Sequence, residues 1–431
     1  MRSASVVLFA LAAAAGTAHA HPIDVYPEQY EVIGRAGQAT PQDLLAATTY
    51  GMLLSHDGGV TWRWVCEAAF GVTDSWAPEY EYLASGRITA TSVGGLYRSE
   101  DGCVWEPTGA PGGTDVASTT ARGSDGSLWL GSGTAPAVVL RSTDDGATWN
   151  TTGSLGTGVN WIETIAVAPS DPLRVYATGA SGIGLARQAR VWRSDDGGAS
   201  WNVVSTTAIA PDDDTELLIA AVSPTDADRV YLLRLDPSAA DDVVYRSDDA
   251  GAGWTEVLRA EDTIPAVVER ADGSVLIATR GGGLHHAADS GATFALLPGR
   301  RFTVACLTEL ADGRLWLCAD NFGADDMGLG TSRDASTWTF VMTMLDLVGP
   351  LDCPAGTIQH DDCRGTWCAY RGMYGIPSEA VSCQAPDGGI ITEPEEPTCL
   401  GCGAGDDPRA AVMWLVGALA ILLAVHRRRA R

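Results

Sequence analysis

Short apolar runs that end in a polar residue recur along the chain, and each is followed by a turn rich in Ser, Asp and Gly. Clear examples are residues 95–98, 190–193 and 243–246. Runs of this length, bounded by turn residues, are typical of β-strands. The pattern therefore predicts an all-β protein. A second set of apolar runs lies upstream of these, several after an Asp-Gly or Asp-Pro turn, at 128–130, 174–177, 275–278 and 315–318.

The turn itself recurs seven times and follows the pattern Ser-x-Asp-x-Gly-x-x-Trp, which we call the box. Four copies are near-complete, the copy at 287–294 is weaker, and the copies at 99–105 and 332–338 are one residue short. Its closing aromatic residues are 40 to 53 positions apart, the size of one four-stranded blade. Seven boxes predict a single seven-bladed β-propeller over residues 21–345. The Asp and the closing aromatic of the seven boxes are Asp57 and Trp62, Asp101 and Trp105, Asp144 and Trp149, Asp196 and Trp201, Asp249 and Trp254, Asp289 and Phe294, and Asp334 and Trp338.

Each part of the box has a local structural use. Ser and Asp side chains accept hydrogen bonds from backbone N–H groups in a tight loop, and Gly adopts a left-handed conformation without a Cβ clash. The closing Trp enters the next strand and buries a large flat surface, which we expect to lie between blades. We therefore interpret the box residues as structural and not as chemical groups of a site.

These motifs resemble the Asp-box, or BNR, repeat family over roughly residues 40–345. The resemblance implies a β-propeller with the boxes on the blade periphery, away from any active site. The family includes sialidases, xyloglucan-degrading glycosidases, sortilin-type receptors and a photosystem II assembly factor. Membership alone therefore implies no single activity.

The catalytic set of the sialidases is not recognisable in the sequence. Those enzymes resemble six-bladed propellers that hold a substrate carboxylate with three arginines, one of them in an Arg-Ile-Pro motif before the first box. Here Arg35 precedes the first box but is followed by Ala-Gly, and Arg87-Ile88-Thr89 lies after that box and lacks the proline. We expect a binding or scaffold module for a protein or polysaccharide ligand. The alternative is a sialidase-like or related exo-acting glycoside hydrolase.

No cofactor or metal is expected. The acidic runs 212–214 and 325–326 match no EF-hand spacing, and they are interpreted as solvated loop tips. His285 and His286 would point to opposite faces of a strand, which is poor geometry for one metal ion. Between residues 21 and 408, 54 acidic side chains stand against 22 arginines, a net charge of −32. A surface of this charge repels nucleic acid, so we expect no nucleic-acid partner.

Both ends of the chain carry targeting patterns. Residues 1–20 read as a signal peptide with cleavage between Ala20 and His21, which predicts export. A Pro/Gly/Glu-rich linker spans 385–408, and residues 409–431 form a predicted transmembrane helix with an Arg tail. The linker contains Gly401-Cys402, and this end resembles the myxobacterial C-terminal sorting signal. The resemblance implies removal of the helix and attachment at the cell surface through Cys402, whereas a plain membrane anchor is the alternative.

Ten cysteines in an exported chain predict disulfide bonds. Cys306 and Cys318 flank an Asp-Gly turn symmetrically, so we predict that they pair across a hairpin. Cys66 and Cys103, in the first two blades, are the next predicted pair. Residues 346–384 form a Cys-rich segment that could close the last blade. Its cysteines could form two further disulfides of undetermined connectivity, and the alternative is a zinc site. They are Cys353, Cys363, Cys368 and Cys383.

Overall fold

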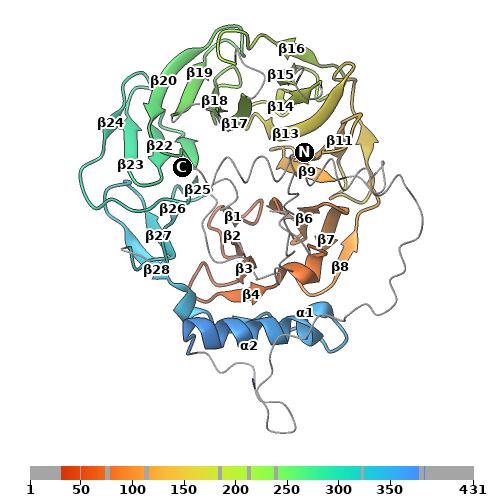
Figure 1. The fold of residues 1–431 in the computed structure, drawn as a ribbon, viewed down its shortest axis with the longest axis vertical. Coiled ribbons are helices and arrows are strands. Elements are labelled where there is room, and N and C mark those ends of the chain that lie inside the picture. The colour runs from red at the N-terminus through yellow and green to blue at the C-terminus, as the bar shows by residue number, and fades with distance from the viewer. Residues whose placement is uncertain are drawn as a thin grey trace, which may run out of the picture.

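Among the described residues, seven sheets stand in a ring around a central axis, and each contains four consecutive antiparallel strands (Figure 1). This computed structural model describes residues 31–48, 50–72, 78–110, 116–182, 187–210, 215–236, 241–321, 325–377 and 383. Each sheet is one blade made of four consecutive strands, and the predicted all-β seven-bladed propeller is confirmed. The first strand of each blade is innermost, and the fourth lies at the rim.

The first four blades contain strands β1 to β16. Alternation of buried and exposed positions, with boxes between the third and fourth strands, sets their register. The strands are β1 Val32–Gly34, β2 Leu44–Thr48, β3 Gly51–Ser55 and β4 Arg63–Val65; β5 Tyr80–Tyr82, β6 Ile88–Ser92, β7 Gly95–Ser99 and β8 Trp105–Pro107; β9 Ala117–Arg122, β10 Leu128–Ser132, β11 Val139–Ser142 and β12 Asn150–Thr151; β13 Val159–Val167, β14 Val175–Ser181, β15 Gln188–Ser194 and β16 Asn202–Val204.

Blades 5 to 7 repeat this plan, and short helices follow the last blade. The strands are β17 Glu216–Val222, β18 Val230–Leu235, β19 Asp242–Ser247 and β20 Thr255–Ala260; β21 Ala266–Glu269, β22 Val275–Thr279, β23 Gly283–Ala287 and β24 Ala295–Leu296; β25 Cys306–Glu309, β26 Leu315–Cys318, β27 Leu329–Ser332 and β28 Thr339–Met342. The remaining elements are β29 Gly349–Pro350, the 3-10 helices η2 Glu67–Phe70 and η4 Met344–Asp346, and the α-helices α1 Ile358–Asp361 and α2 Cys363–Tyr374.

The hydrophobic core is divided among the seams between blades, and a pair of tryptophans lies in the seam between blades 7 and 1. Trp62, the closing residue of the first box, is 1% exposed and packs edge-on against Trp316 of blade 7, with ring centroids 6.1 Å apart. Gly59 of the same box has φ 92°, and a Cβ there would lie 2.6 Å from the Trp316 ring. Only glycine therefore allows the two blades to meet this closely.

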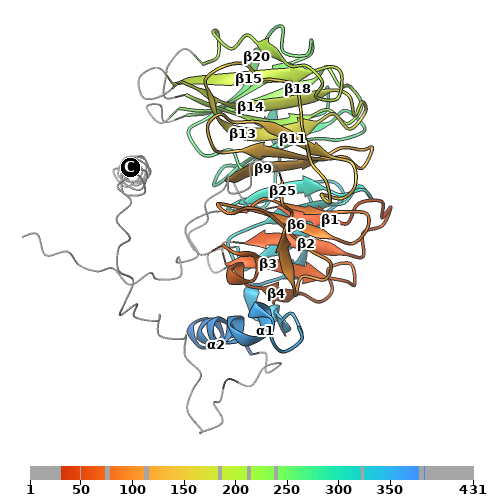
Figure 2. The ribbon, with the colours of Figure 1, turned by 90° about the vertical axis from the view of Figure 1, so that its right-hand side faces the viewer.

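A segment after blade 7 returns to blade 1, and we call it the C-terminal strap (residues 348–376). Its strand β29 pairs in parallel with β4, so the first sheet has five strands. Trp367 of α2 is fully buried and lies 6.0 Å from the Trp64 ring. Helices α1 and α2 cover the rim beside β4 (Figures 1 and 2). The strap thus extends the first blade and not the last.

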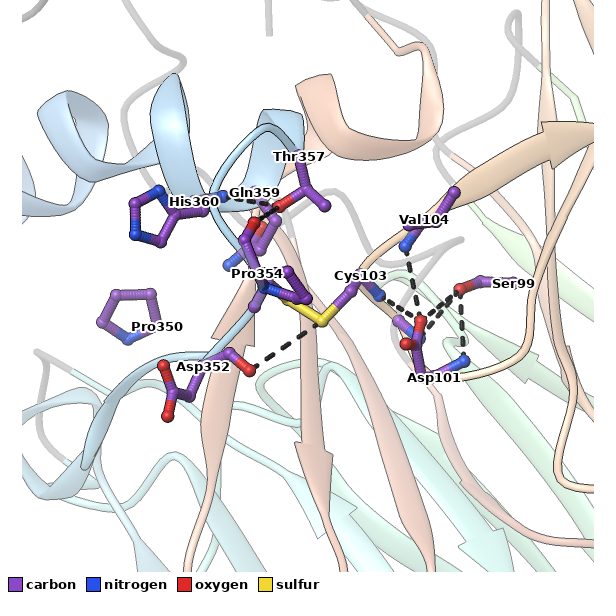
Figure 3. Close-up of a disulfide and its surroundings, with 12 residues drawn as sticks. Ser99, Asp101, Cys103, Val104, Pro350, Asp352, Pro354, Thr357, Gln359 and His360 are labelled. Carbon is purple, nitrogen blue, oxygen red and sulfur yellow. Dashed lines mark hydrogen bonds between the residues drawn. A yellow bond between two sulfur atoms is a disulfide. The ribbon is translucent and has the colours of Figure 1, made fainter.

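Four disulfides join cysteines within the described ranges. The predicted Cys306–Cys318 bond is confirmed across β25 and β26. The predicted Cys66–Cys103 bond is wrong, because the strap runs past both cysteines and brings a partner to each. Cys66 pairs with Cys363, and Cys103 pairs with Cys353 (Figure 3). The fourth bond joins Cys368 to Cys383, so none of these eight cysteines is left for zinc.

Candidate functional site

A channel of about 740 Å³ runs along the axis of the ring, and every blade contributes to its wall. The innermost strands form this wall because each blade begins at the axis. Four glutamates line the channel: Glu31 before β1, Glu79 before β5, Glu269 at the end of β21 and Glu309 at the end of β25. Among the described lining residues there is no arginine, lysine or histidine, so the wall is acidic.

Two of these glutamates are neutralised by arginines from the neighbouring blade. Glu269 Oε1 accepts hydrogen bonds from Arg229 Nη1 at 3.0 Å and from Ser223 Oγ at 2.7 Å. Glu309 Oε1 accepts from Arg270 Nε at 2.7 Å. These pairs join blades 5 and 6 and blades 6 and 7, and they add little net charge to the channel.

The other two glutamates belong to a group in blades 1 and 2 that we call the carboxylate cluster: Glu31, Glu79 and Glu81. Glu79 Oε2 accepts the backbone N–H of Thr120 in blade 3 at 2.8 Å. Glu81 lies 3.8 Å from Arg122 Nε, beyond a close hydrogen bond. Arg122 itself donates to the Tyr82 carbonyl at 2.7 Å. One arginine therefore faces three carboxyl groups, which are crowded together on this side of the channel.

Burial and mutual repulsion raise the pKa values of the carboxylate cluster. Desolvation by the channel wall raises the pKa of Glu79 to about 7 and that of Glu81 to about 7. The pKa of Glu31 is also raised by desolvation and by the nearby charges of Glu81 and Glu79. The Glu31 side chain remains accessible to channel water, which limits how far its pKa rises. The cluster thus holds protons near neutral pH that ordinary glutamates would have lost.

Hydroxyls and apolar side chains complete the wall. Thr164 Oγ1 lies 2.6 Å from Thr178 Oγ1 and accepts the Ile219 N–H at 2.9 Å, so it is held by its neighbours. A wall of carboxylates, hydroxyls and short apolar patches can accept hydrogen bonds from sugar hydroxyls or from N–H groups of a polypeptide. The remaining threonines and representative apolar residues of the wall are Thr119, Thr120, Thr308, Ile165, Val267 and Leu307.

The seven boxes lie elsewhere. Each one connects the third and fourth strands of its blade, and none of its Asp or aromatic residues lines the channel. In the third box, Asp144 accepts from Ser142 Oγ at 2.8 Å, Thr148 N at 2.8 Å and Thr148 Oγ1 at 2.6 Å. The Thr148 hydrogen bonds hold the pKa of Asp144 at about 2. The corresponding Ser-to-Asp hydrogen bond recurs in boxes 1, 2, 4, 5 and 7.

The arginines considered for a carboxylate clamp do not meet at the axis. Arg35 pairs with Asp43 at 3.0 Å and donates to the Ala84 carbonyl, and Arg87 pairs with Glu100. Neither lines the channel. The described part of the wall therefore contains no three-arginine arrangement of the sialidase type.

The histidine pair is separated as the strand pattern predicts. His285 and His286 are successive residues of β23, and their cross-strand partners are Ile277 and Leu276. Burial lowers the pKa of His285. Across the described residues, no group of three or more His, Cys, Asp or Glu side chains is arranged to hold a metal ion.

Several predicted sites lie outside the described residues. These are the cleavage point at Ala20 and His21, the linker with Gly401 and Cys402, and the helix at 409–431. Within the described ranges, no helix combines the length and the hydrophobicity needed to cross a bilayer.

Sequence reasoning missed the carboxylate cluster. The signal was present in the alternation Glu79-Tyr80-Glu81-Tyr82, in which tyrosines face the core while glutamates face the other side. That alternation could have shown an inner strand with both carboxylates on one face, the face that meets Thr120 and Arg122 of blade 3.

Comparison with known proteins finds the fold but no family. No protein-family model matches the sequence, and no curated protein matches it. Among solved structures, an ancestral GH74 enzyme is 15% identical over 74% of this chain and 47% of its own, with a TM-score of 0.52. The extracellular domain of the putative hybrid two-component system BT4673 from B. thetaiotaomicron is 11% identical over 71% and 39%, with a TM-score of 0.48.

A third similar structure is YCF48 from Cyanidioschyzon merolae, 15% identical over 74% of this chain and 86% of its own, with a TM-score of 0.42. This chain spans about half the length of the GH74 enzyme it matches. Identities this low carry over the architecture and not the activity. The chain is thus a seven-bladed β-propeller, of a fold that is also found in GH74 enzymes.

Proposed function

We propose that this protein is an exported, surface-anchored binding module of the Asp-box propeller family, which takes up part of a protein or polysaccharide ligand in its axial channel. The observation that carries the proposal is the acidic wall of the channel. The carboxylate cluster lies on one side of it, and its described lining residues include no arginine, lysine or histidine. Such a wall favours ligands that offer hydrogen-bond donors to its carboxyl and hydroxyl oxygens.

Two further observations support parts of this proposal. The Ser-to-Asp hydrogen bond recurs in six of the seven boxes, which is consistent with the Asp-box family. Four disulfides among the described residues are typical of an oxidising compartment outside the cytoplasm. The predicted signal peptide and C-terminal anchor agree with that compartment.

Glycoside hydrolysis is the second candidate, and the carboxylate cluster is the observation that favours it. Glycosidases generally use two carboxyl groups, one of them protonated near neutral pH. The raised pKa values of Glu79 and Glu81 would allow one group to act as an acid while another stays ionised. The GH74 likeness is compatible with this role but reports the fold alone.

One experiment separates the two candidates. The mature protein is applied to a glycan array and to immobilised polypeptides of opposite charge, and the same sample is incubated with xyloglucan oligosaccharides and a fluorogenic sialoside. The binding proposal expects capture without turnover, weakened at least tenfold by E79Q/E81Q and unchanged by E106Q, an exposed glutamate at the rim. If the native protein hydrolyses one of these substrates and E79Q/E81Q does not, the function is glycoside hydrolysis and not binding alone.

A further inference from the structure

The way the strap is fixed to the ring has a topological consequence. Cys66 ends the outer strand of blade 1, and its bond to Cys363 encloses all of blades 2 to 7 in one covalent loop, with a sequence separation of 297. Cys103 lies in the box of blade 2, and its bond to Cys353 makes a second loop, with a separation of 250. The two loops are nested, so the second one lies inside the first.

The strap is also seated non-covalently on the first blade. Gln359 is 1% exposed; its Nε2 donates to the Trp64 carbonyl at 2.8 Å, and its Oε1 accepts the Cys66 N–H at 3.0 Å. Leu351 N–H donates to the same Trp64 carbonyl at 2.8 Å. These contacts hold the strap beside the two cysteines that it bonds, and they make its path along the rim specific.

Without the two disulfides, a pull on the C-terminal end would first break the non-covalent contacts of the strap with blade 1 and would then act on blade 7. Strand β28 has four residues and is the edge strand of that blade. An edge strand pulled at its end separates from its neighbour one hydrogen bond at a time. With the bonds intact, the pull reaches blade 1 through Cys66 before it can reach β28.

We infer that the C-terminal strap is a covalent load path, so that a pull between the channel and the C-terminal end passes through blade 1 and the strap and bypasses blades 2 to 7. The channel end of this path is β1, whose neighbour Glu31 lines the channel. The Cys103–Cys353 bond is the reserve path, which carries the load once Cys66–Cys363 is broken. That such a load arises in the cell, between a ligand and the anchor, rests on the proposed function.

The test is single-molecule force spectroscopy on the full chain, with handles at its N-terminal and C-terminal ends. The length released between residues 32 and 383 follows the shortest covalent path, at about 3.5 Å per residue. The native protein should release only about 14 nm. C103S/C353S should release the same length, C66S/C363S about 30 nm, and the variant lacking all four cysteines about 110 nm.

A second measurement avoids the variants, in case one of them does not fold. The native chain, held extended while dithiothreitol is added, should lengthen by about 16 nm when Cys66–Cys363 is reduced and by about 80 nm when Cys103–Cys353 follows. Reduction of Cys368–Cys383 and Cys306–Cys318 should add only about 5 nm and about 4 nm. Release of about 110 nm by the oxidised native chain would overturn the inference, as would a longer release by C103S/C353S than by the native chain. No ligand takes part, so failure of the binding proposal would leave these lengths unchanged.

Discussion

The seams between blades 4 and 7 are held differently from the seam that closes the ring. In blades 4 to 7, arginines reach across to the next blade: Arg193 Nη1 donates to the Ala250 carbonyl at 2.9 Å, and Arg270 pairs with Glu309. Arg246 likewise donates to the Ser290 carbonyl. An arginine also crosses the seam between blades 1 and 2, where Arg35 donates to the Ala84 carbonyl. What sets the closing region apart is the packing of Trp62 on Trp316 between blades 7 and 1, together with the strap and its disulfides to blades 1 and 2.

The difference follows from position along the chain. Blades 4 to 7 are consecutive, so each seam joins segments that their connections already hold close together. The closing seam joins the two ends of the propeller, and bringing distant segments together costs more chain entropy. A crosslink across a long loop removes much of that cost from folding, which explains why the covalent bonds are concentrated here.

The largest effect should come from removing the strap bonds. The C66S/C363S/C103S/C353S variant should lose about 4 kcal/mol or more of unfolding free energy, because each long-loop disulfide contributes about 2–5 kcal/mol. Urea denaturation without reductant measures this loss. The matched control is C306S/C318S, which opens a loop of separation 12 and should cost less. An equal loss in the control would contradict the account of the closing seam.

The second-largest effect should come from breaking the arginine–glutamate pair between blades 5 and 6. The Glu269 side chain is fully buried against Arg229, so R229M leaves a buried carboxylate without its cation and should cost about 2–4 kcal/mol in urea denaturation. The double variant R229M/E269M should recover much of that loss. If the double variant were as unstable as R229M, the bridge would owe its effect to packing and not to charge.

The carboxylate cluster should make the free energy of unfolding depend on pH. Because burial raises the pKa of Glu79 to about 7, the folded state binds more protons than the unfolded chain above pH 4.5. Stability should therefore fall as pH rises from about 4.5 to about 7 and then level off. E79Q should remove part of that fall, about 1–2 kcal/mol at pH 8 after allowance for channel water. Thermal melts of the native protein and of E79Q at pH 5 and pH 8 measure this difference. If stability falls equally in both proteins between these pH values, the raised pKa does not belong to Glu79.

The smallest effect should come from single boxes. Asp144 accepts three hydrogen bonds from Ser142 and Thr148, whereas the sixth box has Ala287 in place of the serine. Asp289 accepts the Ala292 and Thr293 N–H groups, both at 3.1 Å. D144A should lower the melting temperature by a few degrees, and D289A by less. Equal shifts measured by circular dichroism would show that the serine adds nothing to the box.

The sequence could predict those features that depend on residues within a single repeat. The boxes, the blade length and the Cys306–Cys318 hairpin all depend on residues within about one blade of each other, so spacing alone revealed them. The partners of Cys66 and Cys103 could not be found in this way. They depend on where the chain arrives after a full turn of the ring, and the two-residue strand β29 leaves no periodic signal.

The carboxylate cluster was missed for a related reason. Its members come from two blades, Glu31 before β1 and Glu79 and Glu81 around β5, and they meet only because both inner strands face the axis. Spacing within one motif cannot show such a meeting. A blade-by-blade alignment of inner-strand positions would have been needed to place these glutamates in a common channel.

The path of the chain decides where a fusion partner can be attached. The described chain begins beside the axis at Glu31 and reaches the rim at α2, on the outer side of β4 (Figure 1). A tag fused close to residue 31 would therefore sit at a channel mouth and compete with any ligand there. A reporter or a solid support attached to the strap itself, at α2 on the rim, would leave that mouth clear, which makes the strap the better choice for immobilised assays and for display (Figure 1).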